Sequence, residues 1–177
     1  MRRLVDIDLL GDGALQSDMA MGSLLILIAG TLLGLCGMVL IPHEDISVLW
    51  FVLLVAVSAA ALPVHELVHA VAFKLVTGFS AHVTFGFTGW MLHTSAPGTL
   101  LPRGRFYAVL LAPALLVTLA VGCGFWAAGM PLLGWFLAVA HLSGCTGDLG
   151  YARIIASEPM AAWVEDTERG IALFYDE

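Results

Sequence analysis

Charged residues are scarce in this sequence. They make up 12% of its 177 residues, whereas soluble globular chains usually carry about 25%. Hydrophobic residues account for 60%, and the mean hydropathy is +0.95. This composition excludes an ordinary soluble domain. The net charge of −7 and the lack of a long basic run argue against nucleic acid as a partner.

Signals for processing and for disulfide formation are also lacking. The first twenty residues hold four aspartates and no apolar run long enough for a signal-peptide core, and Arg2 excludes N-myristoylation. Cys36, Cys123 and Cys145 lie far apart without a CxxC pair, so no disulfide framework is expected. For Cys36 and Cys123 we expect the role of small, buried apolar residues.

Four apolar blocks, by contrast, are each about as long as the roughly 20 residues that cross a bilayer as a helix. The blocks comprise residues 21–41, 48–73, 105–128 and 132–156. They predict an all-α integral membrane protein with four transmembrane helices in one domain, residues 21–156. A segment of residues 1–20 precedes this domain, a loop of residues 74–104 joins its second and third helices, and a tail of residues 157–177 follows.

All seven basic residues fall on one side of this four-helix arrangement. They are Arg2, Arg3, Lys74, Arg103, Arg105, Arg153 and Arg169. Three or five helices would scatter them over both sides. The positive-inside rule therefore places both termini and the long loop in the cytoplasm, with the chain as a multi-pass protein of the cell membrane.

The long loop and the tail carry further patterns. Residues 81–88 alternate apolar with small or polar side chains, which predicts a strand that pairs with residues 90–95 as a short hairpin. After Ser157 the apolar residues fit an amphipathic helix that rests on the membrane surface, and a frayed tail fits equally well.

The second apolar block contains the motif His65-Glu66-Leu67-Val68-His69. Histidines four residues apart lie on one face of a helix, so both imidazoles can reach one metal ion. Glu66 is close enough to hold a water molecule on that metal without taking a coordination site. Zinc lowers the pKa of such a water to about 7, and a neighbouring carboxylate can then move its proton.

Ionisable residues inside a spanning helix are costly, at about 2.5–3.5 kcal/mol each near the bilayer centre, which favours a functional role for this trio. The alternative is that the three side chains only bond neighbouring helices or reach the cytoplasmic interface. A third metal ligand must come from elsewhere, and Asp148 is the only acidic residue in the other apolar blocks. At about 1.5 Å per residue, Asp148 and His65 lie at the same depth in their helices.

His141 and Cys145 are the alternative third ligands. Together with Asp148 they follow an i, i+4, i+7 pattern and so share one face of the fourth predicted helix. His141 lies about 10 Å further along the axis than Asp148. It is therefore better interpreted as a contact to the substrate or transition state, and a histidine bonded between helices is the alternative.

Four stretches together resemble a known family. They are His65-Glu66-Leu67-Val68-His69-Ala70, the hairpin-forming loop, Leu111-Ala112-Pro113-Ala114 and the run from His141 to Asp148. They resemble the family of small membrane proteins described as "putative zincin peptidase", which is similar to the site-2 protease superfamily of intramembrane zinc metallopeptidases. The resemblance covers roughly residues 48–156. It implies zinc held by His65, His69 and Asp148, with Glu66 as general base, and peptide-bond hydrolysis at or within the membrane.

The chain departs from site-2 proteases in one stretch. Those proteins usually carry an Asn-Pro stretch before an Asp-Gly pair, whereas here Leu149 follows Asp148 and His141 stands about where the asparagine would be. The leading hypothesis is an intramembrane zinc metalloprotease that acts on membrane proteins or peptides, alone or as a homo-oligomer. The alternative is a catalytically silent metal-binding membrane scaffold, which would not need Glu66. A transporter is disfavoured, because no inverted repeat is clear.

Overall fold

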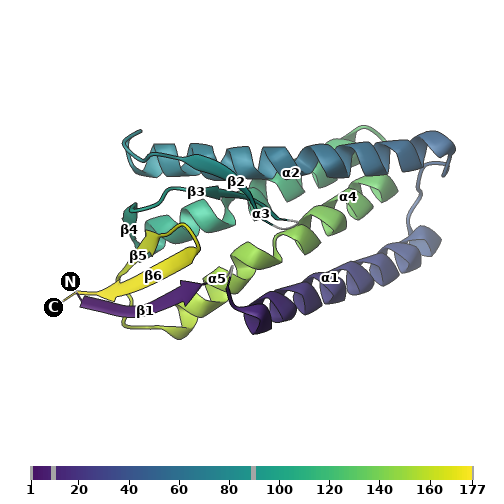
Figure 1. Cartoon of the computed structure of the whole chain (residues 1–177). Helices are drawn as coiled ribbons and strands as arrows, with labels where there is room; N and C mark the ends of the chain where they lie inside the picture. Colours follow the sequence, from purple (N-terminus) through teal and green to yellow (C-terminus); the bar gives the residue numbers. More distant parts are fainter. Residues whose placement is uncertain (1, 9–10, 89–90, 177) are drawn as a thin grey trace.

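Five helices form most of the chain in the computed structural model, which describes residues 2–8, 11–88 and 91–176 (Figure 1). The helices are α1 (Gly13–Leu40), α2 (Val48–Val76), α3 (Arg103–Ala127), α4 (Pro131–Gly144) and α5 (Thr146–Ser157). Six strands accompany them, namely β1 (Arg2–Asp8), β2 (Thr84–Thr88), β3 (Met91–Ser95), β4 (Leu100–Pro102), β5 (Trp163–Asp166) and β6 (Gly170–Tyr175).

Three of the helices, α1, α2 and α3, are long and apolar enough to cross a membrane. α4 and α5 meet the same requirement only as one span, and they are bent by 52° at the break between them. The described residues therefore hold three candidate spans, or four if the bent pair is one. The expected unbroken helix over residues 132–156 is wrong, and α1 begins eight residues earlier than residue 21.

The break at Cys145 has a local cause. Gly144 and Gly147 flank it, and glycine is a poor helix former. The Cys145 N–H donates to the Leu142 carbonyl, three residues back, at 3.1 Å, which tightens the end of α4. The break redirects the chain, so the first turn of α5 points differently from the last turn of α4.

Glycine contacts hold α1 against α4. A Cβ atom added to Gly30 would lie 2.5 Å from Val139 Cγ1, and one added to Gly34 would lie 2.8 Å from Trp135 Cδ1. Trp135 Nε1 donates to the Gly30 carbonyl at 2.8 Å. Small residues of this kind allow helix backbones to approach closely in a membrane, where burial of apolar surface gives no net drive for association.

Glu44, in the connection between α1 and α2, caps the start of α4. Its carboxylate accepts the N–H groups of Leu132 and Leu133 at 3.1 and 2.7 Å, and Trp50 Nε1 at 2.9 Å. Burial acts to raise the pKa of the Glu44 carboxyl, but these hydrogen bonds and one from its own N–H together hold that pKa below its usual value. The negative charge also lies at the positive end of the α4 dipole.

Replacing this cap tests its contribution to stability. We expect Glu44→Gln to destabilise the protein at neutral pH by about 1 kcal/mol, with the partly exposed charge screened by solvent. Because the folded pKa is lowered, the stabilisation is present above the unfolded pKa and is lost as pH falls through the folded one. Melting temperatures of both proteins in detergent, measured across this range, should converge in acid. Equal melting temperatures at neutral pH would contradict the assignment.

Both ends of the chain and the short strand β4, which precedes α3, form one antiparallel sheet in the order β1-β6-β5-β4. The tail is therefore neither an amphipathic helix nor frayed, and the all-α prediction is wrong here. Val164, Ile171 and Leu173 turn inward and are almost fully buried, packed with Phe73 of α2 and Phe106 of α3. Local periodicity could not predict this sheet, because its partners β1 and β6 are separated by almost the whole chain.

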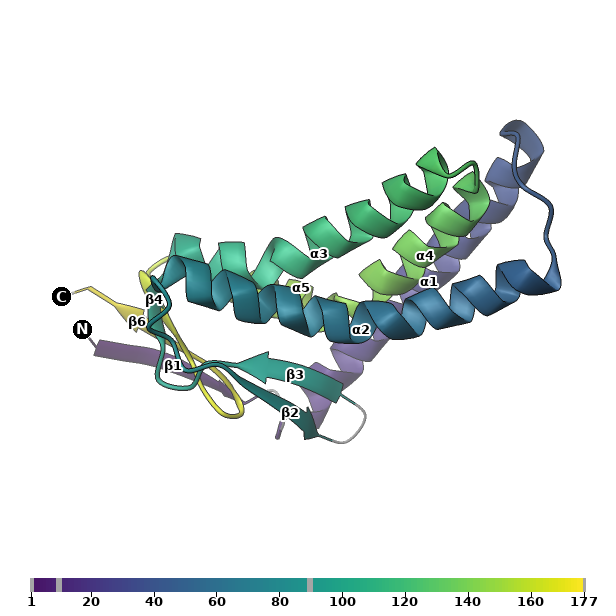
Figure 2. The same cartoon turned by 90° about the horizontal axis from the view of Figure 1, so that it is seen from above.

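The sheet and both termini lie at the end of the helices where α2 finishes and α3 begins (Figures 1 and 2). The α1–α2 and α3–α4 connections lie at the other end. There a second apolar cluster joins α2 and α4 through Trp50, Leu132, Leu133 and Leu137. Cys36 and Cys123 are exposed rather than buried, which corrects the sequence expectation. In a spanning helix, residues that face the lipid are apolar as well as those that face the protein interior. The polarity of a residue therefore does not predict whether it is buried or exposed.

The predicted hairpin is confirmed for the described residues. β2 pairs with β3 in antiparallel register, with Phe85 opposite Thr94, while Trp90 of the predicted second strand lies outside the described residues. The hairpin runs alongside α2 (Figure 2). Thr94 Oγ1 donates to the Glu66 carbonyl at 2.9 Å, and the Asp166 carboxylate accepts the Ala96 N–H just after β3. The hairpin is thus fixed to the motif helix and to the terminal sheet.

Candidate metal centre

His65 and His69 face the same side of α2, as their spacing predicts. Their Nε2 atoms lie 3.1 Å apart, and their ring planes are 76° apart, with the centroids 4.8 Å from one another. His69 is buried and His65 nearly so. Two imidazole nitrogens this close, in an apolar setting, need a proton or a cation between them.

Asp148, in the first turn of α5, supplies a carboxylate to this pair. Its Oδ2 lies 3.2 Å from His65 Nε2 and its Oδ1 lies 3.3 Å from His69 Nε2. The residues that were expected to meet by depth do meet. The break before α5 places Asp148 among the first residues of a helix, where a negative charge also suits the helix dipole.

The three side chains fit a zinc ion. Ligand atoms about 2.0–2.1 Å from zinc at tetrahedral angles lie about 3.3 Å from one another. Here the two Nε2 atoms are 3.1 Å apart, and each has one of the two Asp148 carboxylate oxygens at 3.2 or 3.3 Å. Two imidazoles and one carboxylate are also a ligand set found at catalytic zinc sites that keep one position open. His65, His69 and Asp148 therefore form one of two groups among the described residues that could hold a metal.

A proline in α3 fixes the orientation of His69. Pro113 has no N–H, so the Val109 carbonyl four residues earlier has no helical donor at that position. His69 Nδ1 lies 3.1 Å from this Val109 oxygen, and so carries the proton that it donates there. The lone pair of His69 Nε2 then points toward His65 and Asp148. Ligating histidines commonly donate their other N–H in this way.

Glu66 is buried beside this group, with 8% of its surface exposed. Its Oε2 atom has no hydrogen-bond partner within the described residues. A buried carboxylate oxygen left unpaired is costly unless a solvent molecule or substrate bonds to it. The position thus suits the predicted role of holding and deprotonating a water molecule.

The family comparison agrees with this geometry. A family model described as "Putative zincin peptidase" matches residues 59–163, more than half of the chain. The matched stretch includes the motif, the hairpin, α3, α4 and α5. The chain belongs to this family. No match was found among curated proteins or among solved structures. Family membership and the metal-compatible group together indicate a zinc peptidase.

His141 lies against the other side of the His65 ring. His141 Nε2 is 3.3 Å from His65 Nδ1, and Thr118 Oγ1 of α3 is 2.8 Å from His141 Nδ1. Buried Cys145 lies close by, with its Sγ 3.8 Å from His65 Nδ1. Sequence reasoning missed Thr118 and Val109. Pro113 was a usable signal for Val109, but nothing in the sequence singles out Thr118.

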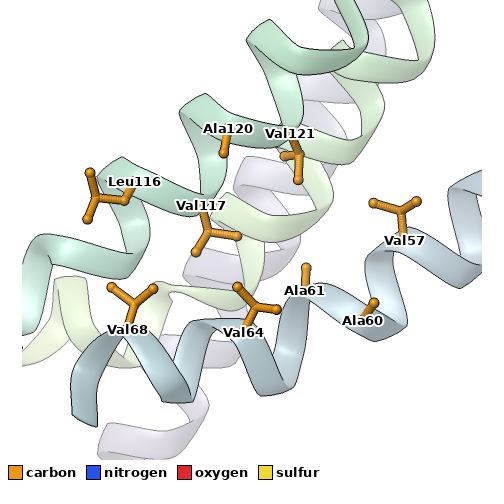
Figure 3. A pocket seen from close by; sticks show the side chains of 9 residues that line it. All are labelled: Val57, Ala60, Ala61, Val64, Val68, Leu116, Val117, Ala120 and Val121. Atoms are coloured by element: carbon orange, nitrogen blue, oxygen red, sulfur yellow. The ribbon is translucent and has the colours of Figure 1, made fainter. Parts of the chain in front are cut away.

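An apolar groove of about 360 Å³ runs between α2 and α3. Figure 3 shows valines from the two helices pointing toward each other across it, among them Val64 and Val117. Val64 and Val68 each directly precede a histidine of the motif. The groove offers almost no polar surface, so the reactive groups are confined to the cluster of histidines and carboxylates.

The role of Pro113 can be tested through metal affinity. In Pro113→Ala the new N–H competes for the Val109 carbonyl, so His69 loses its orienting partner and zinc affinity should fall about 10- to 100-fold. Zinc competition titrations against a chelating dye, with purified protein in detergent, measure this change. Val117→Ala, in the same helix, is the control for general loss of packing. Unchanged zinc affinity in Pro113→Ala would show that the Val109 contact has no such role.

Proposed function

We propose that this protein is an intramembrane zinc metalloprotease that hydrolyses peptide bonds of membrane or membrane-proximal substrates. His65, His69 and Asp148 are its metal ligands and Glu66 is its general base. The observation that carries the proposal is the convergence of two imidazole nitrogens and a carboxylate beside the unpaired, buried Glu66 oxygen.

Bound zinc would polarise the scissile carbonyl and acidify a water molecule. Glu66 is the general base. Its Oε2 accepts a proton from that water while the water oxygen attacks the carbonyl carbon. The same carboxyl then donates the proton to the leaving amine nitrogen, so that Glu66 ends in its starting state. The low polarity around Glu66 strengthens its hydrogen bond to the water.

His141 remains a candidate contact to the substrate or transition state. In the folded chain its two ring nitrogens lie within hydrogen-bond distance of His65 and Thr118. A direct contact to a substrate would therefore need one of these partners to be replaced. The present contacts suit a positioning role. His141 Nε2 accepts a hydrogen bond from the His65 Nδ1–H group, which keeps the lone pair of His65 Nε2 directed toward His69 and Asp148.

The proposed topology has four spans, with α4 and α5 as one bent span and both termini in the cytoplasm. All seven basic residues belong to the terminal sheet and its β5–β6 turn, to the long loop or to the helix ends on one side, which supports this orientation through the positive-inside rule. The metal centre then lies in the cytoplasmic half of the bilayer. Cys145, at the α4–α5 break, is fully buried in the protein, which shields its polar backbone at that depth.

Substrate would bind in an extended form along the β2–β3 hairpin. A peptide bond inside a helix is shielded, so a segment must unwind before it can be cleaved. Pairing with a strand edge supplies the main-chain hydrogen bonds that the unwound segment has lost. β3 is bonded to the Glu66 carbonyl through Thr94, so a peptide held by the hairpin lies next to the general base.

Variants at Glu66 and Asp148 distinguish an active enzyme from a catalytically silent metal-binding scaffold. We expect Glu66→Gln to keep its zinc but to lower proteolysis by a factor of about 10²–10⁴, the usual contribution of a general base. Asp148→Ala should lower zinc occupancy as well as activity. Zinc is measured by elemental analysis, and cleavage with single-span reporter peptides in proteoliposomes.

Glu168→Gln is the matched control, because Glu168 is exposed in the turn between β5 and β6. It should leave both zinc content and cleavage unchanged. Wild-type protein that holds no zinc after purification from zinc-replete medium without chelators would contradict the enzyme assignment. Full activity in Glu66→Gln would contradict the assigned base.

A further inference from the structure

The His65 ring takes part in two groups of potential metal ligands, one through each nitrogen. Its Nε2 faces His69 and Asp148, whereas its Nδ1 faces His141 and Cys145. Cys145 has no exposed surface and His141 has 8%. Within the second group, Cys145 has no part in the hydrolysis described above, and His141 only positions His65 there.

We propose that His65 Nδ1, His141 Nε2 and Cys145 Sγ form a second metal position, for a thiophilic divalent ion, that competes with the first for His65. The nitrogens lie 3.3 Å apart, and the sulfur lies 3.8 and 4.0 Å from them. Around a tetrahedral zinc ion, two nitrogen ligands are about 3.3 Å apart and a nitrogen and a sulfur ligand about 3.6 Å. Small side-chain movements therefore suffice to bind an ion there.

Thr118 already orients His141 for this role. Thr118 Oγ1 lies 2.8 Å from His141 Nδ1, so it can accept the proton on that nitrogen and leave the Nε2 lone pair facing His65. This is the same arrangement that Val109 provides for His69. Each of the two groups thus contains a histidine whose outer nitrogen is held by a hydrogen-bond acceptor from α3.

One proton on His65 makes the two positions exclusive. A neutral imidazole has one N–H and one lone pair. When Nε2 holds a metal, the proton is on Nδ1 and is donated to His141 Nε2, which is then no longer available as a ligand. When Nδ1 holds a metal, the proton is on Nε2 and is donated to Asp148. Rotation of the ring is not required.

The two positions differ in the ions they favour. A carboxylate ligand suits harder ions, and a thiolate selects softer ones such as Cd²⁺. At present the Cys145 thiol lies 3.2 Å from the His141 carbonyl and donates to it. Metal binding forms a metal–sulfur bond and releases the thiol proton to solvent. On the proposed function, an ion in the second position removes His65 from the catalytic one and stops hydrolysis.

The experiment is a titration of the full-length protein in detergent with Cd²⁺ alone, followed by the ultraviolet absorbance of thiolate-to-metal charge transfer. We expect wild type and Asp148→Asn both to develop the band at one ion per chain, and Cys145→Ser to lose it. Cys123→Ser is the matched control and should keep it. If Asp148→Asn fails to fold, the same measurement is made on His69→Ala.

The outcomes separate this proposal from the protease assignment. If wild type binds zinc but neither Asp148→Asn nor His69→Ala gives a thiolate band with Cd²⁺, the second position is overturned and the first stands. A band that survives in Cys145→Ser also overturns it. Simultaneous binding of zinc and Cd²⁺ in wild type would contradict competition for His65. Wild type that binds neither ion contradicts both proposals.

Discussion

The pairing of His65, His69 and Asp148 inside an apolar helix bundle is the constraint on which the rest of the structure depends. Each of these groups is costly to bury alone, and they lie 3.1–3.3 Å apart. Meeting at these distances requires α2 and α5 to be held in fixed positions. The α4–α5 break, the α1–α4 glycine contacts and the Glu44 cap on α4 all serve that requirement.

Hydrogen-bond acceptors on α3 orient two of the clustered histidines. Val109, whose carbonyl Pro113 leaves without a helical donor, fixes His69, and Thr118 fixes His141. A histidine that is merely near a metal can present either nitrogen, so the acceptor decides which one faces inward. The α3 helix contributes no ligand itself, yet it determines the tautomers of two histidines. At the end of the bundle, the sheet of both chain termini packs against α2 and α3 and completes their support.

Much of this arrangement could be predicted from the sequence. The apolar blocks predicted the long helices, and the alternation in residues 81–88 predicted the hairpin. The equal depths of Asp148 and His65 in their helices predicted that these two residues meet. The terminal sheet and the α4–α5 break could not be predicted, for different reasons. Pairing of β1 with β6 joins segments about 170 residues apart, which local periodicity does not register. The apolar block of residues 132–156 has the length of one unbroken spanning helix, so its composition does not indicate a break. Because the break was missed, so was the contact between His141 and His65.

The ligand set of zinc in the purified protein is the most direct test of this account. X-ray absorption at the zinc edge distinguishes nitrogen and oxygen ligands from sulfur. With one zinc per chain, the account predicts two imidazoles and oxygen ligands that include a carboxylate, at about 2.0–2.2 Å, without sulfur. A chain that binds no zinc, or a zinc whose ligands include sulfur, would contradict the central claim that His65, His69 and Asp148 hold the metal.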